Sequence, residues 1–154
     1  MNPNIDDRLA SVIRALSDII LPSLPVDAGL AVEQAQLCIG QLQIIHSQIN
    51  QTPDFERDEA DDARALALAL VDGAAGGARS MAAVAALDRA VDGGGPPRHA
   101  RHAINTAIDA LVQAMAQDGD PAWRQSATQS LIRMEGERAM KDRRWFQPMG
   151  FDTL

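Results

Sequence analysis

Apolar side chains recur at steps of three and four residues along most of this chain, and no window alternates strictly between apolar and polar residues. Helical spacing of this kind places apolar side chains on one face of an α-helix, whereas a half-buried strand requires alternation. The pattern therefore predicts an all-α protein. The first segment illustrates it with a stripe made of Ile5, Leu9, Val12, Ile13, Leu16, Ile19 and Ile20.

Start and stop signals divide the chain into predicted helices. The first ends near the prolines of 21–25, the second spans about 27–50, and the third runs from a Thr52 cap and Pro53 to a stop at Gly73. Three more are expected at about 80–91, at 97–117, and from Asp120 and Pro121 to as far as Arg144. We predict an up-and-down bundle of four to six helices in a single domain, 1–154, with 145–154 as a C-terminal tail. The helix at 27–50 is apolar over more than half of its circumference and is expected to be central.

Charge and composition restrict the classes of partner. A net charge of -7 argues against nucleic acid, because affinity for phosphate backbones depends on clustered cations. No apolar run approaches the ~20 residues that cross a bilayer, and the N-terminus lacks the features of a signal peptide. No predicted helix has a basic polar face along its whole length, as membrane-surface helices do. We expect a cytoplasmic protein without a membrane partner.

Four basic or titratable side chains open the helix at 97–117: Arg98, His99, Arg101 and His102. Cations in a first helical turn oppose the helix dipole, at about 0.3–1 kcal/mol each where exposed. Two explanations would offset this cost. Either the acidic start of the helix after Thr52 lies nearby and pairs with these residues, or an external anion such as a phosphate, a carboxylate or an acidic partner segment binds there.

No metal, cofactor or catalytic residue is predicted. His99 and His102 could share a helix face, but the Glu-x-x-His spacing of di-iron bundles does not occur in the sequence. His46 falls amid an apolar face and is interpreted as a core residue rather than a general base, because no nucleophile or carboxylate is spaced to pair with it. Cys38, the single cysteine, is interpreted as a small buried apolar residue.

Three further motifs suggest a functional role but also have a structural interpretation. The heptad row of Gln34, Gln41 and Gln48 either fixes the register between helices or subunits or marks the solvent line of one helix. The acidic run DFERDEADDAR at 54–64 is attributed to helix-end complementarity, because a magnesium site would need a second acidic helix. The loop GAAGGARS at 73–80 departs from the phosphate-loop pattern, with Arg79 in place of its lysine and no preceding strand.

Aromatic and methionine side chains gather at the C-terminus, where Trp145, Phe146, Met149 and Phe151 follow the expected end of the last helix. Such side chains are enriched at protein interfaces. This segment either folds back on its own bundle to close one end or docks on a neighbouring molecule.

The N-terminal part of the chain resembles small uncharacterised helical proteins of bacteria. The resemblance lies in an amphipathic helix followed by ILPSLP, then LAVEQAQLCIGQLQII, then a Thr-Pro turn into an acidic helix, and it covers roughly the first 70 residues. It carries no catalytic motif and implies an accessory role.

Two functions agree with these observations. The first is a non-catalytic helical accessory or protein-interaction module that self-associates as a homo-oligomer or binds a protein partner. The alternative is a small-molecule binding protein or an enzyme with a pocket between helices, in which Arg98, Arg101 and the nearby histidines hold an anionic small molecule.

Overall fold

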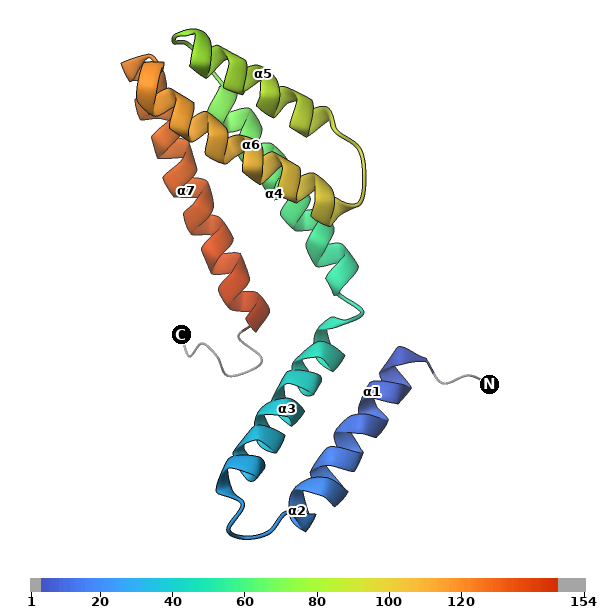
Figure 1. The fold of residues 1–154 in the computed structure, drawn as a ribbon. Helices are drawn as coiled ribbons and strands as arrows, with labels where there is room; N and C mark the ends of the chain where they lie inside the picture. Colours follow the sequence, from blue (N-terminus) through green and yellow to red (C-terminus); the bar gives the residue numbers. More distant parts are fainter. Residues whose placement is uncertain (1–3, 147–154) are drawn as a thin grey trace. The chain divides into compact units, whose positions relative to one another are not determined.

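The computed structural model describes residues 4–146, and within them the chain is all-α, as predicted (Figure 1). No strand occurs among these residues apart from an isolated bridge between Gly76 and Gly119. The helical elements are α1 (Ile5–Arg14), a π-helical segment η1 (Ala15–Ile20), α2 (Leu21–Ser23), α3 (Gly29–Gln48), α4 (Thr52–Val71), α5 (Ala78–Asp92), α6 (Pro97–Asp118) and α7 (Pro121–Phe146).

The chain divides into two compact units, 1–52 and 53–154, which are described separately. The single domain expected from the sequence stays a prediction. None of the helices within 4–146 combines the length and the apolar character needed to span a bilayer.

The first unit is a helical hairpin in which α1, η1 and α2 form one continuous arm and α3 forms the other (Figure 1). The Asn4 side chain accepts a hydrogen bond from the Asp7 amide (2.8 Å) and so caps α1. Asp6 links the arms by accepting a hydrogen bond from Asn50 (2.9 Å). Within 4–52, Ile39 is the one large apolar side chain that is buried.

The helical arm continues through Pro22 and ends at Ser23, close to the predicted stop. Proline has no N–H and its ring crowds the carbonyl four residues earlier, so it normally breaks a helix. The π-helical turn of η1 immediately precedes Pro22, and its wider hydrogen-bonding pattern accommodates the proline. The extended backbone of Leu24 then terminates the arm.

The second unit is an up-and-down bundle of α4, α5, α6 and α7. Trp123 near the start of α7 donates its indole N–H to the Leu70 carbonyl near the end of α4 (2.9 Å), so these two helices are antiparallel. The core, drawn from all four helices, consists of Ala63, Leu66, Ala67, Leu70, Val84, Leu87, Ile104, Ile108, Leu111, Met115, Trp123 and Ala127.

One end of this bundle is held by a clamp between two loops. The Asp118 carboxylate accepts hydrogen bonds from the Arg79 and Ser80 amides (both 2.9 Å) and from the Ser80 hydroxyl (2.5 Å), so it caps α5 from the end of α6. Gly76 has a φ of +151°, and a Cβ there would lie 2.8 Å from the Asp118 carbonyl oxygen. The loop that superficially resembles a phosphate loop therefore accommodates an internal carboxylate.

The helix predicted to be central is not central to this core. The cluster that fills the bundle contains no residue of α3, and Cys38, predicted to be buried, is exposed. His46 is not a core residue either: its side chain is 39% exposed and its Nε2 lies 3.9 Å from Asp6. These three corrections share one cause, because the residues of 4–52 bury only one side of α3. The Thr52 hydroxyl, expected to cap α4, donates to the Gln48 carbonyl at the end of α3 (3.0 Å).

Candidate functional site

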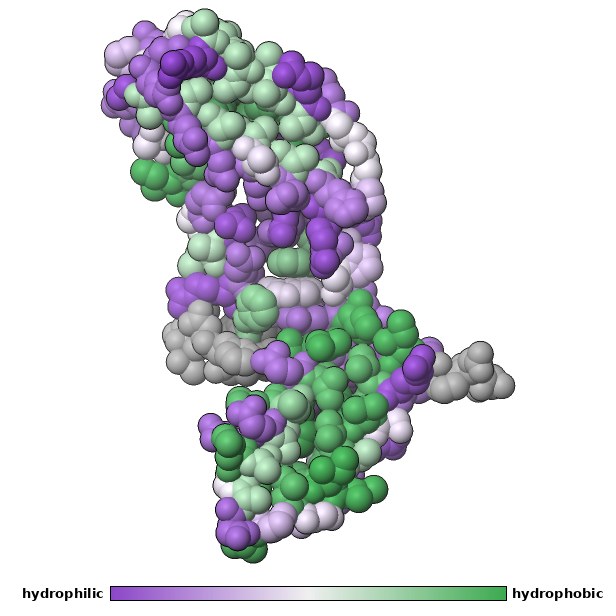
Figure 2. Space-filling view, in the orientation of Figure 1, coloured by the Kyte–Doolittle hydropathy of each residue, from purple (hydrophilic) through white to green (hydrophobic). Residues whose placement is uncertain are grey.

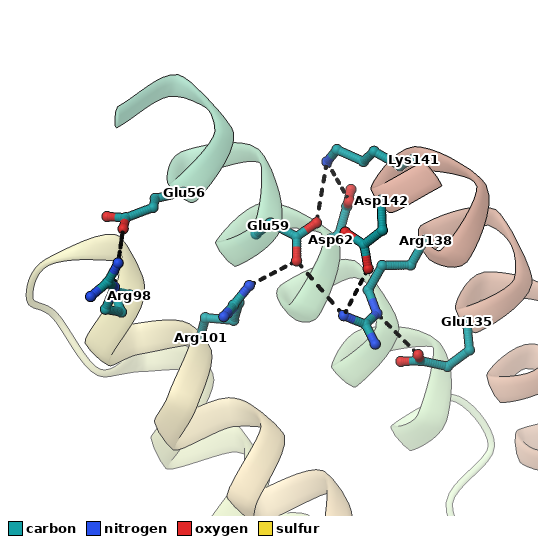
Figure 3. Close-up of polar contacts among 9 residues, drawn as sticks. All are labelled: Glu56, Glu59, Asp62, Arg98, Arg101, Glu135, Arg138, Lys141 and Asp142. Carbon is teal, nitrogen blue, oxygen red and sulfur yellow. Dashed lines mark hydrogen bonds and ion pairs between the residues drawn. The ribbon is translucent and has the colours of Figure 1, made fainter. Parts of the chain in front are cut away.

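The basic residues at the start of α6 meet the acidic start of α4 (Figure 3). Arg98 contacts Glu56 at 2.8 Å and Arg101 contacts Glu59 at 2.8 Å. Both pairs join residues 42 positions apart, so α4 and α6 run parallel with their starts together. Internal pairing is thus the explanation that the structure supports for the two arginines.

The two histidines predicted beside these arginines lie elsewhere. His99 and His102 are exposed, and neither lines the cavity described below. Among residues 4–146, no group of three or more His, Cys, Asp or Glu side chains is placed to hold a metal ion. Of the four residues predicted at this helix start, only Arg101 contributes to an enclosed site.

Glu59 is the acidic residue that the sequence analysis missed. It is only 2% exposed, although it belongs to a run of acids near the start of a helix. Its Oε2 accepts the hydrogen bond from Arg101, whereas its buried Oε1 has no hydrogen-bond donor. The nearest recorded cation to Oε1, the Lys141 ammonium, is 3.9 Å away, which is too far for a hydrogen bond.

The C-terminal half of α7 supplies two further cations to this region (Figure 3). Arg138 lies 3.8 Å from Glu59 and donates to Glu135 at 3.0 Å, and Lys141 donates to Asp62 at 2.6 Å. Burial lowers the pKa of Arg138, but the hydrogen bond to Glu135 and the nearby carboxylates outweigh it and leave the pKa raised. Arg138 therefore remains a cation, and beyond Met134 the helix lies along α4 through charged contacts.

These side chains line a cavity of about 400 Å³ between α4, α6 and α7. Its walls combine apolar and charged groups: Glu59, Asp62, Ala63, Leu66, Arg101, Asn105, Met134, Glu135, Glu137, Arg138, Lys141 and Arg144. A cavity of this size with a few converging polar groups is typical of small-molecule sites.

A second feature of interest is the outer face of α3 in the hairpin. Ile39 lies on the side that is buried against the other arm, and the exposed side carries Leu30 (73% exposed), Leu37 (55%) and Ile45 (47%). Gln34 and Gln41 are exposed between them. In Figure 2 apolar surface covers much of the hairpin, and exposed apolar surface of this extent is typical of interaction sites.

The other arm repeats this pattern. Ile5, Val12 and Ile19 stand seven residues apart and are all exposed, and no residue of α1 or η1 is buried. A shallow groove on this arm is lined by Ile5, Arg8, Leu9 and Val12. Both arms of the hairpin thus present large apolar side chains to solvent.

The aromatic residues predicted for the tail are partly inside the last helix. The helix α7 continues to Phe146, two residues beyond the predicted limit, so Trp145 and Phe146 are helical. Trp145 stacks on Phe55 of α4, with ring centroids 4.2 Å apart and planes inclined by 21°. Phe146 is exposed, and Met149 and Phe151 lie outside the described residues.

One signal in the sequence could have identified Glu59. Glu59, Ala63, Leu66 and Leu70 follow one another at steps of four, three and four residues, so the acid continues the buried stripe of α4. Arg138 and Lys141 extend the stripe of α7 in the same way. When charged residues on two neighbouring helices occupy core positions at the same end, they pair with each other.

Comparison of this chain with known protein families, with curated proteins and with solved structures gives no match.

Proposed function

We propose that this protein is a non-catalytic interaction module that self-associates through the outer face of α3. The observation that supports the proposal is the hairpin itself: within 4–52 it buries only Ile39 among its large apolar side chains and leaves Leu30, Leu37 and Ile45 exposed. Two helices seldom enclose a core, and their stability in proteins comes mainly from packing of apolar faces. A second hairpin would supply the missing packing.

The apolar contacts of such an association set its energy. If two copies bury this face, six half-exposed large side chains leave water, which contributes on the order of 5–9 kcal/mol at ~1.5–3 kcal/mol per fully buried side chain. The loss of translational and rotational freedom offsets at least about 4 kcal/mol of this energy. The remainder, up to about 5 kcal/mol, corresponds to a dimer that forms at concentrations of about 0.2 mM and above.

The chemistry of the face suits a second copy of this chain. In α3 the only Asp, Glu, Lys or Arg side chain is Glu33, so two copies can approach without strong charge repulsion. In an antiparallel pairing centred between Leu37 and Cys38, Gln34 of one copy lies level with Gln41 of the other. Amides paired across an apolar interface fix its register, which was one of the two roles considered for this row. Two hairpins packed in this way would place the two α3 helices side by side at the centre of a four-helix assembly.

The test is the mass of the full-length chain in solution. Size-exclusion chromatography with light scattering over a concentration series should give a dimer, and Leu37→Glu should convert it to a monomer. The matched control is Leu68→Glu, because Leu68 on α4 is 59% exposed, much like Leu37, but lies in the other unit. A wild-type monomer would overturn the proposal. A dimer that survives Leu37→Glu would place the interface elsewhere.

A second measurement tests the antiparallel arrangement. Cys38 is exposed near the middle of α3, so a short bismaleimide should link two copies through this single thiol. Cys38→Ser should abolish the covalent dimer without changing the mass seen by light scattering. A stable dimer that the reagent does not link would rule out a pairing centred on Cys38.

A further inference from the structure

Among the residues that line the cavity between α4, α6 and α7, one buried side-chain oxygen, Glu59 Oε1, has no hydrogen-bond donor. The other lining carboxylates are already engaged, because Asp62 binds Lys141 at 2.6 Å, Glu135 binds Arg138 at 3.0 Å and Glu137 binds Arg133 at 3.1 Å. A buried acceptor without a donor carries the cost of its lost hydration. This oxygen therefore selects a ligand that brings a hydrogen-bond donor into the cavity.

The donor that fits is uncharged. Three cations already surround the Glu59 carboxylate within 4 Å, at 2.8 Å (Arg101), 3.8 Å (Arg138) and 3.9 Å (Lys141). A ligand ammonium at Oε1 would lie close to the Lys141 ammonium and would be repelled by it. A hydroxyl satisfies the oxygen without this repulsion.

The same cavity offers donors to an acid. Arg101 uses one N–H on Glu59, and a guanidinium has five donors. Arg144 also lines the cavity, and no ion pair is recorded for it within 4–146. Arginine binds carboxylate and phosphate groups through two parallel hydrogen bonds, so these two side chains are suited to an anionic group.

From these contacts we infer that the cavity between α4, α6 and α7 binds a small hydroxylated organic acid. The hydroxyl donates to Glu59 Oε1 and the acid group accepts from Arg101 and Arg144. The short carbon chain between them packs on Ala63, Leu66 and Met134, which supply the apolar part of the wall. At about 400 Å³ the cavity accommodates a molecule of this size. This site is separate from the α3 face, and its ligand does not depend on self-association.

The test compares acids that differ by one hydroxyl. Isothermal titration calorimetry of the full chain with malate and succinate, and with lactate and propionate, measures the contribution of that group directly. We expect each hydroxy acid to bind about tenfold more tightly than its partner, the effect of one hydrogen bond to a charged group. Failure of all four acids to bind at millimolar concentration, or equal affinities within both pairs, would overturn the inference.

Three variants assign the effect to this cavity. Glu59→Gln should reduce the difference between malate and succinate to about twofold or less, since the acceptor loses its charge. Arg144→Gln should weaken both acids by about tenfold and should leave the fold unchanged, because Arg144 is exposed. The control is Arg124→Gln, at an exposed position near the start of the same helix and outside the cavity, which should bind all four acids as the wild type does. The inference fails if the hydroxyl preference persists in folded Glu59→Gln, or if Arg144→Gln binds like the control. Should Glu59→Gln not fold, the Arg144 and Arg124 variants still decide the outcome.

Discussion

The two units of this protein are built from similar helices but treat their apolar side chains in opposite ways. In the bundle of α4–α7, four helices surround one core and Leu70, Leu87 and Leu111 are fully buried. In the hairpin, the 20-residue helix α3 is apolar on both sides and buries only one of them. The difference shows that a helix with two apolar faces requires neighbours on both, which a hairpin alone does not supply.

Each unit also departs from simple patterning at the place where we propose binding. The bundle buries a charged residue, Glu59, at a core position, whereas the hairpin exposes large apolar residues such as Leu30. Natural proteins depart from consistent patterning mainly at functional sites. The buried charge indicates a site for a small polar ligand, and the exposed apolar face indicates a site for another helix.

Truncation of one leucine in each unit should reveal the largest difference between the bundle and the hairpin in the free energy of unfolding. Leu111→Ala in the bundle should lower the free energy of unfolding by about 3–4 kcal/mol, because it leaves a cavity in a closed core. Leu37→Ala in the hairpin should change it by less than ~1 kcal/mol in the monomer. Far-UV circular dichroism during urea unfolding reports the helices of both units, whereas tryptophan fluorescence reports the bundle alone, because both tryptophans lie in the second unit. An equal shift in both variants would contradict the comparison.

A matched pair of glutamates on α4 tests whether burial makes the difference within the bundle. Glu56 and Glu59 each pair with an arginine of α6, but their side chains are 29% and 1% exposed. Glu59→Ala should cost about 2–3 kcal/mol, since it leaves partly buried cations unpaired, and Glu56→Ala less than ~1 kcal/mol. Thermal unfolding of both variants at pH 7 provides the measurement. Similar losses of stability in the two variants would show that burial of the Glu59 carboxylate does not determine the effect.

The clamp at Asp118 should give the smallest effect and a distinct pH dependence. The Ser80 hydroxyl foremost, and the Arg79 and Ser80 amides, hold the pKa of Asp118 below its ordinary value of 3.8. A carboxyl group whose pKa is lower in the folded state than in the unfolded state stabilises the protein at pH values above the unfolded pKa. This stabilisation is lost as the pH falls through the folded pKa.

Asp118→Asn should therefore lower the Tm by roughly 5 °C at pH 7, the effect of one helix cap in a unit of this size. The difference from wild type should shrink below about pH 3.8, near the ordinary pKa of the carboxyl group. Asp109→Asn, at an exposed position on the same helix, serves as the control and should leave the Tm almost unchanged. A Tm difference that is independent of pH would exclude ionisation of Asp118 as the source.

Much of the fold could be predicted because its signals are local. Asp120 and Pro121 begin α7 as expected, with the Asp120 carboxylate accepting from the Ala122 and Trp123 amides at 2.9 and 3.1 Å. Burial could not be predicted in the same way, because periodicity identifies an apolar face without showing whether anything covers it. Cys38 and His46 were misplaced for this reason.

Only part of the candidate site could be predicted from the sequence. The charge pattern left two explanations open for Arg101, pairing with the acidic start of α4 or binding of an external anion, and the structure pairs Arg101 with Glu59. It did not single out Glu59 from the acids around it, because a helix N-terminus favours every one of them. The place of Glu59 on the buried stripe of α4 distinguishes it in the sequence, and the convergence of α4, α6 and α7 shows that its carboxylate is buried.

The clamp between the loops at one end of the bundle leaves the α5–α6 connection at the other end comparatively free. A Cβ at Gly94 or Gly95 would meet no atom within 4 Å, whereas one at Gly76 would collide with backbone. Exposed connections of this kind accept inserted sequence more readily than held ones. A grafted epitope or a fused domain therefore belongs after Gly94, where the scaffold can display foreign sequence without loosening the helices that carry it.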